Sequence, residues 1–374
     1  MKIPLAKPDI TDLERKAVLE VLKTPNLSLG PKLKEFEKKI AKFIGVKYAV
    51  GVNSGTSALH LIIRTLGIKD GDEVITTPFS FIASANCILF ERAKPVFVDI
   101  DEKTLNIDTS KIEEKITKKT KAILVVDIFG HPAEWNSLQK IAKKYKLFLI
   151  EDSAEALGSE YKEKKCGSFG EAAILSFYPN KQITTSEGGI ILTNSKELAD
   201  FCQSMANQGR RVKNGKWLEH IRLGYNYRMP EVCAAMGIAQ LNRINEILKK
   251  REMVARMYNQ KLKDFSEIEI PYIAPNVKMG WFVYVIKLSK RYSKKDRDEI
   301  IKKIAKRGIQ CGNYFQPIHL QPFYRKMFGF KFGSFPIAES VSQRTITLPF
   351  YNNLKEREIN YVVKNLKEII KKLK

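Results

Sequence analysis

Short, nearly continuous apolar runs recur along the first 200 residues, separated by segments whose apolar positions have helical spacing. Three of these runs are Pro95–Ile100, Ala122–Ile128 and Leu147–Ile150. Such runs are typical of strands that are buried on both faces of a parallel sheet. The segment between the last two runs predicts a helix, which we expect Asn136 to cap. This alternation of strands and helices predicts an α/β fold.

The N-terminal segment predicts two helices before the first strand. Asp12 can cap the first helix, and Pro31 pre-sets the first turn of the second, which ends at Gly45.

A turn of small residues follows a short apolar strand that starts at Tyr48, and this turn opens another helix. Gly55 permits close approach to the backbone, and the amides of Thr56 and Ser57 lie at the helix start. Unpaired N–H groups and the positive end of the helix dipole bind phosphate well. A plain N-cap explains these residues equally well, because the turn is neither a Walker loop nor a GxGxxG motif.

The stretch Ser176–Gly189, SFYPNKQITTSEGG, places Lys181 in a tight polar turn between two apolar runs. These runs, Ala172–Phe177 and Ile190–Thr193, predict two short buried strands that hold the turn in place. The pKa of a lysine shifts readily when the amine is desolvated, which suits a Schiff-base amine. In a chain so rich in lysine, a solvated loop lysine is the competing interpretation.

Two further residues are candidates for a cofactor site. Asp152 ends a predicted strand, and ligands of open α/β sheets bind at the carboxyl ends of strands. A carboxylate there can hold a protonated heterocycle nitrogen, although Asp152 can equally cap a helix over Ser153–Leu157. Phe81 follows the predicted strand Glu73–Thr77 and can lie flat on a cofactor ring, but aromatic residues in apolar helices are more often core residues.

The pattern changes in the C-terminal third of the chain. One long helix is predicted from Pro230 to about residue 263, and its later, charged part is expected to cross between domains. Trp281–Ile286 predicts a strand, Ser293 caps a helix, and Ile359–Leu373 predicts an amphipathic helix. We expect a large domain over residues 1–250 and a smaller α+β domain over residues 251–374.

Composition narrows the class of protein. The 374 residues include five widely spaced cysteines with no CxxC pair, so neither a zinc site nor a disulfide framework is expected. No signal peptide or membrane-spanning run is evident, which predicts a cytoplasmic protein that does not bind membranes. The formal net charge of +24 is compatible with nucleic acid, an anionic substrate or heat adaptation. Because the lysines are spread over helix faces and no nucleic-acid motif occurs, we expect no nucleic acid as partner.

Four islands in the chain resemble one family. They are NSGTSAL (Asn53–Leu59), EDSAEALGS (Glu151–Ser159), the Lys181 stretch and GYNYRMPEV (Gly224–Val232). In this order they resemble the DegT/DnrJ/EryC1/StrS sugar aminotransferases, which depend on pyridoxal 5'-phosphate (PLP). Gly30-Pro31, TPFSFIASAN and NYFQPIHLQPFY also match, so the resemblance covers nearly the whole chain.

The resemblance implies a fold, an assembly and a chemistry. The fold is the aspartate-aminotransferase fold (fold type I), with a mostly parallel seven-stranded sheet in the large domain and a smaller C-terminal domain. The family works as a homodimer with shared active sites. Lys181 should bond to PLP and, with pyridoxamine 5'-phosphate as the intermediate form, shuttle protons between cofactor and sugar. Asp152 should pair with the pyridine nitrogen. A branch of the family with histidine in place of this lysine dehydrates its substrate instead, so Lys181 implies amino transfer.

The resemblance also assigns further cofactor contacts and supplies the substrate prediction. Phe81 should stack on the ring and Glu155 should lie near the ring hydroxyl, where the family often has Gln or His. The phosphate contacts should come from Gly55, Thr56, Ser57 and Ser176, with Asn226 and Arg228 from the other subunit. Glutamate at position 155 favours the branch of GDP-perosamine synthase-type enzymes.

The predicted reaction moves an amino group from L-glutamate to a keto carbon, favoured as C4, of a nucleotide-linked deoxysugar, for polysaccharide or glycan synthesis. A C3 aminotransferase on a dTDP-keto sugar and a catalytically silent PLP-binding regulatory protein are the alternatives. Arg210 and Arg211, in the basic loop Arg210–Arg222, can meet the diphosphate of the nucleotide sugar. His319 is a candidate for sugar contact. His131 is interpreted as structural, because Asp127 occupies the position of the usual family histidine.

Overall fold

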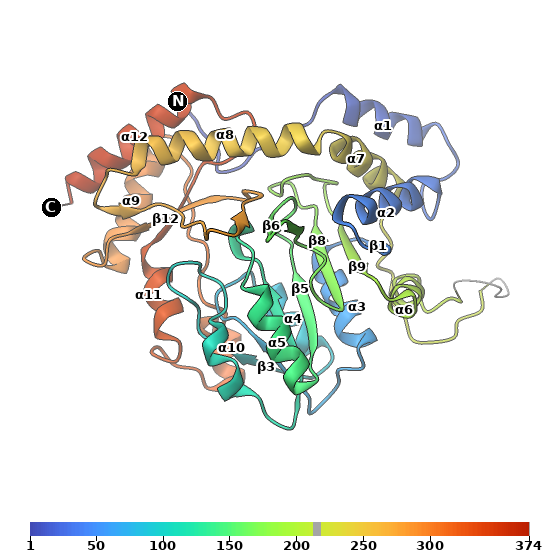
Figure 1. Ribbon diagram of the computed structural model, residues 1–374. Helices are drawn as coiled ribbons and strands as arrows, with labels where there is room; N and C mark the ends of the chain where they lie inside the picture. The colour runs from blue at the N-terminus through green and yellow to red at the C-terminus, as the bar shows by residue number, and fades with distance from the viewer. Residues whose placement is uncertain (212–217, 374) are drawn as a thin grey trace.

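A seven-stranded sheet forms the centre of the computed structural model, which describes residues 1–211 and 218–373 (Figure 1). In spatial order its strands are β1 (Tyr48–Val52), β9 (Gly189–Thr193), β8 (Ala172–Ser176), β5 (Phe148–Asp152), β4 (Thr120–Val126), β2 (Glu73–Thr76) and β3 (Lys94–Phe97). Strand β9 is antiparallel to both of its neighbours, and every other pair in this sheet is parallel. The predicted α/β fold with a mostly parallel seven-stranded sheet is confirmed.

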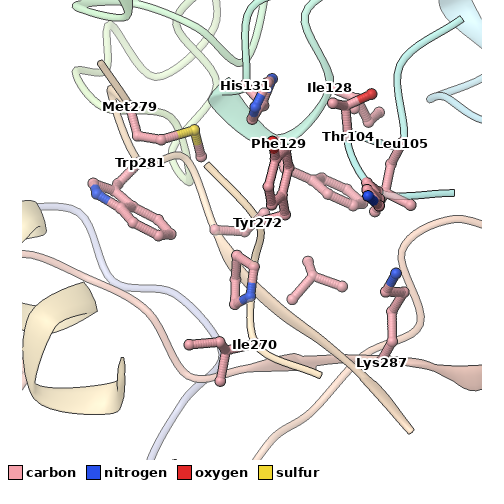
Figure 2. A pocket seen from close by; sticks show the side chains of 14 residues that line it. Thr104, Leu105, Ile128, Phe129, His131, Ile270, Tyr272, Met279, Trp281 and Lys287 are labelled. Carbon is pink, nitrogen blue, oxygen red and sulfur yellow. The ribbon is translucent and has the colours of Figure 1, made fainter. Parts of the chain in front are cut away.

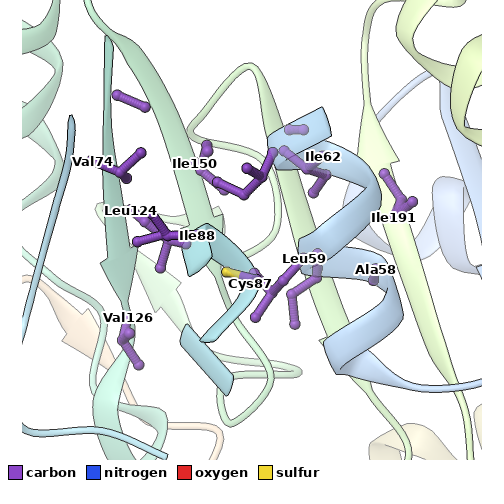
Figure 3. Packing of buried hydrophobic residues seen from close by; sticks show 14 of the residues in the cluster. Ala58, Leu59, Ile62, Val74, Cys87, Ile88, Leu124, Val126, Ile150 and Ile191 are labelled. Atoms are coloured by element: carbon purple, nitrogen blue, oxygen red, sulfur yellow. The ribbon is translucent and has the colours of Figure 1, made fainter. Parts of the chain in front are cut away.

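Helices cover both faces of this sheet, which explains why its strands are nearly continuous apolar runs. The helices that flank the sheet are α2 (Pro31–Ile44), α3 (Gly55–Thr65), α4 (Ala83–Phe90), α5 (Trp135–Tyr145), α6 (Lys196–Ala206) and α7 (Glu231–Asn242), and α1 (Asp12–Leu22) packs against α7. Successive strand residues point to opposite faces. Ile150 packs with α3 and α4 on one face (Figure 3), whereas its neighbour Leu149 packs with α5 on the other. By the same alternation Asp152 faces the α3 and α4 side, and Glu151 faces the α5 side.

The C-terminal part of the chain builds a second sheet, in the order β10-β12-β13. The elements of this part are α8 (Ile244–Leu262), β10 (Ile268–Glu269), β11 (Val277–Lys278), β12 (Tyr284–Leu288), α9 (Lys294–Lys306), α10 (Pro322–Phe328), α11 (Pro336–Arg344), β13 (Thr345–Leu348) and α12 (Glu356–Lys371). Two short strands, β6 (Glu160–Tyr161) and β7 (Lys164–Lys165), form a third sheet with β11. Ile3 of the N-terminal segment joins the core of the second sheet through its pairing with Ile309. The division at residue 250 stays a prediction, and helix α8 runs across it (Figure 1).

Several local predictions are wrong. The N-cap of α1 is Thr11 and not Asp12, because the Leu13 amide donates to Thr11 Oγ1 at 3.3 Å and the Thr11 amide donates to Glu14 at 2.6 Å. The N-cap of α5 is Glu134 and not Asn136. At α1 the reciprocal hydrogen bonds between Thr11 and the first turn set the start of the helix, whereas at α5 no side chain caps the helix. The strand predicted from Trp281 begins only at Tyr284. By contrast, Ser293 caps α9 as predicted.

The single long helix predicted after Pro230 is two helices, α7 and α8, which meet at Arg243 (φ −100°, ψ 7°). Arg243 is buried and donates to Glu14 at 2.9 Å and to Asp9 at 3.1 Å. Asp9 also accepts hydrogen bonds from Asn352 and Asn353 near the end of the chain. The break between the helices is therefore fixed by an ion-pair network that joins both ends of the chain.

Burial alone would raise the pKa of Glu14, but hydrogen bonds from Thr11, Gln240 and Arg243 outweigh it and lower this pKa to about 2. A carboxyl group whose pKa is lower in the folded state stabilises the fold above its unfolded pKa. The contribution of Glu14 should therefore be complete above its ordinary value of 4.5 and be lost as the pH falls toward about 2.

None of the helices within residues 1–211 and 218–373 combines the length and the apolar character needed to cross a membrane.

We expect Arg243→Met to lower the free energy of unfolding by about 3–5 kcal/mol, because the buried carboxylate of Glu14 loses its cation and that of Asp9 keeps only Lys250 among the described residues, at 3.3 Å. Urea unfolding at pH 7 measures this loss. Arg256→Met is the control: the Arg256 side chain is 72% exposed and pairs with Glu252. For this variant we expect a change below about 0.5 kcal/mol. Equal unfolding midpoints for the two variants would contradict the role of the network.

Candidate active site

The carboxyl ends of two adjacent parallel strands bring the main candidates together. Asp152 is the last residue of β5, and Ser176 is the last residue of β8, which pairs with β5. Lys181 follows β8 in a turn whose backbone is held by the hydrogen bond from the Lys181 amide to the Tyr178 carbonyl at 2.9 Å. The two apolar runs that flank Lys181 are the predicted buried strands β8 and β9.

Asp152 lies in a buried polar position and is 4% exposed. Its Oδ2 accepts a hydrogen bond from Ser84 Oγ at 2.7 Å, and its Oδ1 accepts one from the Ala154 amide at 3.2 Å. Residues 153–157 form turns and no helix, so the helix-cap interpretation of Asp152 is wrong. Burial raises the pKa of Asp152, against the opposing effects of Ser84, the Ala154 amide and the charge of Lys181. A cationic group beside this carboxylate would stabilise its ionised form.

Lys181 is desolvated. Its side chain is 12% exposed, with Nζ 3.8 Å from Glu155 Oε1 and 4.1 Å from the centre of the Phe282 ring. Burial lowers the pKa of this amine, while the carboxylates of Glu155 and Asp152 oppose that effect. The interpretation of Lys181 as a solvated loop lysine is therefore wrong. An amine with a lowered pKa is more often neutral and can act as a nucleophile or a proton acceptor.

Glu155 completes this cluster. Its Oε2 accepts a hydrogen bond from the Phe129 amide at 2.8 Å, and its other oxygen faces Lys181. Burial raises the pKa of Glu155 to about 7, although the charge of Lys181 works against this increase. Glu155 can therefore gain or lose a proton near neutral pH.

The small-residue turn at the start of α3 lies against the ends of β8 and β9. A Cβ atom on Gly55 would lie 3.0 Å from the Cβ of Ser176, so the backbone of the turn and Ser176 are in close contact. The N-cap of α3 is Ser54, whose Oγ accepts a hydrogen bond from the Ser57 amide at 3.1 Å. The amides of Gly55 and Thr56 lie in the first turn, where a helix offers no internal acceptor. Three of the predicted phosphate contacts, Gly55, Thr56 and Ser57, thus lie at one helix N-terminus, a suitable site for an anion, and the fourth, Ser176, adjoins it at the end of β8.

Phe81 is 60% exposed and lies just before α4. The alternative interpretation, that Phe81 is a core residue, is therefore wrong. An aromatic ring of this size that is left in solvent remains free to stack on a ligand.

Arg228 pairs with the outer edge of β1, and Asn226 lies two residues before it. The backbone of Asn226 bridges to Asn207, the backbone of Arg228 bridges to Val52, and Arg228 donates to Asn207 Oδ1 at 3.1 Å. Asn226 is exposed. Within one chain these contacts are to the edge strand and to Asn207, so the predicted contact with a second subunit stays a prediction.

Residues 212–217 of the predicted basic loop lie outside the described residues. Arg211 donates to the carboxylate of Glu219 at 2.9 and 3.2 Å. Nε of Arg210 is buried and has no acceptor within the described part of the chain. Neither arginine is tied to the cluster around Lys181 by these contacts.

The structure does not support direct contact of His319 with a sugar. Its side chain is 0% exposed, its Nε2 lies 2.9 Å from Glu339 Oε1, and its ring packs edge-on against Phe335. Burial lowers the pKa of His319, although Glu339 opposes that effect. The motif around His319 indicated a loop near the substrate, but only packing decides which way the ring points.

His131 has the structural role expected of it. Its Nε2 accepts a hydrogen bond from the Ala274 amide at 3.2 Å, so Nδ1 carries the proton and donates to the Pro132 carbonyl at 2.8 Å. The same ring lines a cavity of about 30 Å³ with Phe129 and Trp281 (Figure 2). This cavity is too small for a nucleotide or a sugar.

One group among the described residues could present three metal ligands, namely Asp127, Glu151 and Cys166. Asp127 already accepts hydrogen bonds from the Ala133 amide at 2.8 Å and from Trp135 Nε1 at 3.1 Å. Glu151 accepts one from the Phe169 amide at 2.8 Å. These donors, together with Ser153, account for the buried carboxylates without a metal ion.

Two residues that contact the candidate site were not identified from the sequence. Ser84 orients the carboxylate of Asp152, and the Phe282 ring lies under the amine of Lys181. Ser84 belongs to the TPFSFIASAN stretch, and Phe282 to the predicted strand from Trp281, so both segments were noted. Nothing in either local pattern shows that the side chain reaches a residue about 70 to 100 positions away.

Comparison with known proteins agrees with this geometry. The model of the DegT/DnrJ/EryC1/StrS aminotransferase family matches residues 8–367. The GDP-perosamine synthase of Escherichia coli O157:H7 is 38% identical over 368 residues, which cover 98% of each protein. The UDP-4-amino-4-deoxy-L-arabinose–oxoglutarate aminotransferase of Shewanella sediminis is 33% identical over 98% of each chain. The PLP-form structure of Spr1654 from Streptococcus pneumoniae, named as a sugar aminotransferase, superposes with a TM-score of 0.96 at 29% identity, over 100% of each chain.

The residues present fit PLP. The cofactor requires an amine for its aldehyde carbon, a carboxylate for its ring nitrogen and a cradle for its phosphate. The structure offers a desolvated Lys181, a buried Asp152 and the N-terminus of α3, where a Cβ atom on Gly55 would fill the space.

Gly189→Ala should weaken PLP binding at least about tenfold, or ~1.4 kcal/mol. A Cβ atom at position 189 would lie 2.4 Å from the Ser54 carbonyl oxygen and 2.6 Å from the Gly55 amide nitrogen, so the phosphate cradle must move. Gly51→Ala is the control, because its Cβ atom would meet chiefly the end of the flexible Leu33 side chain. Absorbance titration with PLP measures the two affinities. Wild-type affinity in Gly189→Ala would rule out this cradle.

Proposed function

Because this chain belongs to the DegT/DnrJ/EryC1/StrS aminotransferase family, we propose that it transfers an amino group from L-glutamate to C4 of a nucleotide-linked keto-deoxysugar. The chain is a PLP-dependent sugar aminotransferase. The proposal concerns the donor, the ring carbon and the residues that carry out the reaction. The product would be a nucleotide-linked amino sugar, which serves polysaccharide or glycan synthesis.

The observation that carries the proposal is the desolvated amine of Lys181, 3.8 Å from Glu155 and at the carboxyl edge of the sheet beside Asp152. PLP, when bound, supplies an electron sink for the carbanion that forms when a proton leaves the substrate carbon. Lys181 Nζ bonds the cofactor at rest and, once released by the donor's amine, accepts and returns the proton at the reacting carbon.

The two carboxylates have different tasks in this proposal. Asp152, oriented by Ser84 and the Ala154 amide, holds the ring nitrogen in its protonated form. That cation in turn favours the ionised carboxylate, although burial alone raises the pKa of Asp152. Glu155 has a pKa of about 7 and lies beside the amine, so it can accept a hydrogen bond from the ring hydroxyl or compensate the ammonium.

The names of two relatives support the donor and the ring carbon. The Shewanella protein is named for a 4-amino-4-deoxy sugar and for oxoglutarate, which is the product that remains when glutamate gives up its amino group. The similarity to a GDP-perosamine synthase points to the same kind of nucleotide-linked substrate. The formal charge of +24 suits a dianionic diphosphate, and Arg210 and Arg211 are the proposed contacts for that group.

We further propose a homodimer in which each subunit completes the site of the other. The segment that carries Asn226 exposes apolar side chains, with Leu223 70% and Ile221 39% exposed. Leu27, 51% exposed, lies next to the start of α7, since its carbonyl accepts a hydrogen bond from the Glu231 amide at 3.1 Å. Exposed apolar residues of this kind favour burial against a second copy.

A panel of substrates tests the reaction. Purified protein with PLP and L-glutamate should release 2-oxoglutarate with 4-keto nucleotide deoxysugars and little with their 3-keto isomers. Lys181→Ala should keep the fold by circular dichroism and lose both the covalent PLP adduct and turnover. Faster release of 2-oxoglutarate with 3-keto sugars would show that the amino group is transferred to C3 and not to C4. A yellow protein whose absorbance does not respond to glutamate would favour a silent regulatory protein.

Paired variants test the shared sites. Lys181→Ala and the double variant Asn226→Ala/Arg228→Ala should each be nearly inactive as homodimers. A heterodimer of the two, isolated with two different tags, has one site with an intact lysine and intact partner residues. It should recover about half of the wild-type activity per dimer. If Asn226 and Arg228 served their own subunit, both sites of the heterodimer would be damaged and it would stay inactive.

A further inference from the structure

Gln182, the residue after Lys181, is 3% exposed and links three segments of the site. Its Nε2 donates to the Glu155 carbonyl at 2.6 Å and to the Gly280 carbonyl at 3.2 Å. A carboxamide nitrogen has two hydrogens, and both neighbours can only accept. The orientation of the Gln182 amide group is therefore fixed by its partners, and both of its N–H groups are used.

The two carbonyls belong to the segments that hold the surroundings of the amine. Glu155 carries the carboxylate that lies 3.8 Å from Lys181 Nζ. Gly280 lies two residues before Phe282, whose ring lies 4.1 Å from the same nitrogen. Gln182 is covalently joined to Lys181, so its two hydrogen bonds hold the amine, the carboxylate and the ring in one arrangement.

The packing around Gly280 leaves little room for these segments to shift. A Cβ atom on Gly280 would lie 2.6 Å from the Leu157 carbonyl oxygen, and the Gly280 amide donates to Ser159 Oγ at 2.8 Å. The segment around Gly280 is thus pressed against the turn that carries Glu155. Gln182 bonds to both of these segments, so it can set the position of the lysine turn relative to them.

The carbonyl oxygen of Gln182 is the unusual feature. It is buried and finds no donor among the described residues. Gln182 and Lys181 line the same cavity of about 10 Å³, together with Arg251. Arg251 donates to the carbonyls of Trp281 and Phe282, at 2.6 Å each, and to Asn352 at 2.8 Å. The donor groups of Arg251 are thus directed to other acceptors, and the Gln182 oxygen is left without a donor among the described residues.

A neighbouring glutamine shows what a purely structural role looks like. Gln240 lines the same cavity and is also buried. Its Nε2 donates to the Asp9 carbonyl and to Glu14, at 2.9 Å each, and its oxygen accepts a hydrogen bond from the Thr184 amide at 3.3 Å. Every polar group of Gln240 has a partner, whereas the oxygen of Gln182 remains available.

We propose that Gln182 is a positioning residue for Lys181. Its two N–H groups hold the lysine turn against the Glu155 and Gly280 carbonyls, and so keep the Lys181 amine in its place beside Glu155 and Phe282. This inference rests on the proposed function, which assigns the reacting amine to Lys181. It adds a residue that acts through Lys181 and does not itself touch the cofactor.

Gln182→Met tests the inference, since methionine has a similar length and no hydrogen-bonding group. We expect kcat to fall at least tenfold with KM for glutamate within twofold of wild type, because the amine is misplaced while donor binding is not. In cofactor-free protein, an acylating reagent should label Lys181 at least threefold faster, relative to exposed Lys278, than in wild type. Peptide mass spectrometry measures both labels. Wild-type values of kcat and of labelling would overturn the proposal.

Gln139→Met is the matched control, because Gln139 donates a single hydrogen bond to the Phe169 carbonyl at 3.0 Å. It should leave kcat and the labelling of Lys181 unchanged. Gln182→Asn covers the case in which the methionine variant does not fold: its shorter side chain cannot reach both carbonyls, so the same changes are expected. If neither variant folds, wild-type protein with ¹⁵N-labelled glutamine is used. A glutamine side-chain amide signal that shows slow hydrogen exchange and that shifts when PLP binds would support the proposal. The absence of such a signal would overturn it.

Borohydride reduction of wild-type protein with PLP separates the two hypotheses. If PLP is trapped on a lysine other than Lys181, this result would contradict both the proposed function and this inference. If PLP is trapped on Lys181 but both Gln182 variants have wild-type kcat and wild-type labelling of Lys181, only the inference would be contradicted.

Discussion

Strands β5 and β8 are adjacent and parallel, and this pairing decides where the chain can carry out chemistry. The carboxyl ends of parallel strands lie at the same edge of a sheet, so Asp152 and the turn that holds Lys181 must come close together. Helices on both faces of the sheet partly exclude water from this edge. The result is a lysine whose side chain is 12% exposed, beside the residues Asp152 and Glu155, which are 4% and 5% exposed.

A buried cluster of one amine and two carboxylates needs support on every side. Ser84 and the Ala154 amide satisfy Asp152, the Phe129 amide satisfies Glu155, and the Phe282 ring lies under Lys181. Each of these partners comes from a different segment of the chain. Burial outweighs the attraction between these charges, so it raises the pKa values of Asp152 and Glu155 and lowers that of Lys181. In each case the neutral form of the side chain is favoured. Such a cluster remains ready to exchange protons, which a sugar aminotransferase requires.

The same parts of the structure show how closely the backbone is fitted around the site. At Gly55, Gly189 and Gly280 a single added carbon would collide with the ends of β8, with the α3 turn or with the turn after Glu155. Gln182 bonds across one of these contacts, and its side-chain oxygen has no donor among the described residues. The segment that carries Asn226 and the exposed Leu223 leads to Arg228 at the edge of β1, and it is the proposed surface for a second subunit.

The sequence by itself determined the fold class, the strands β8 and β9 around Lys181 and the place of Asp152 at a strand end, because apolar runs and strand ends are local patterns. The motifs determined the family in the same way. Only the tertiary structure decided that Arg243 breaks a helix, that the ring of His319 is buried against Glu339, and that Phe81 remains in solvent. It alone brought Ser84, Phe282 and Gln182 to the cluster of Asp152, Glu155 and Lys181. These outcomes depend on which residues far apart in the chain become neighbours, and burial, ion pairing and hydrogen bonding with such neighbours outweigh local preference.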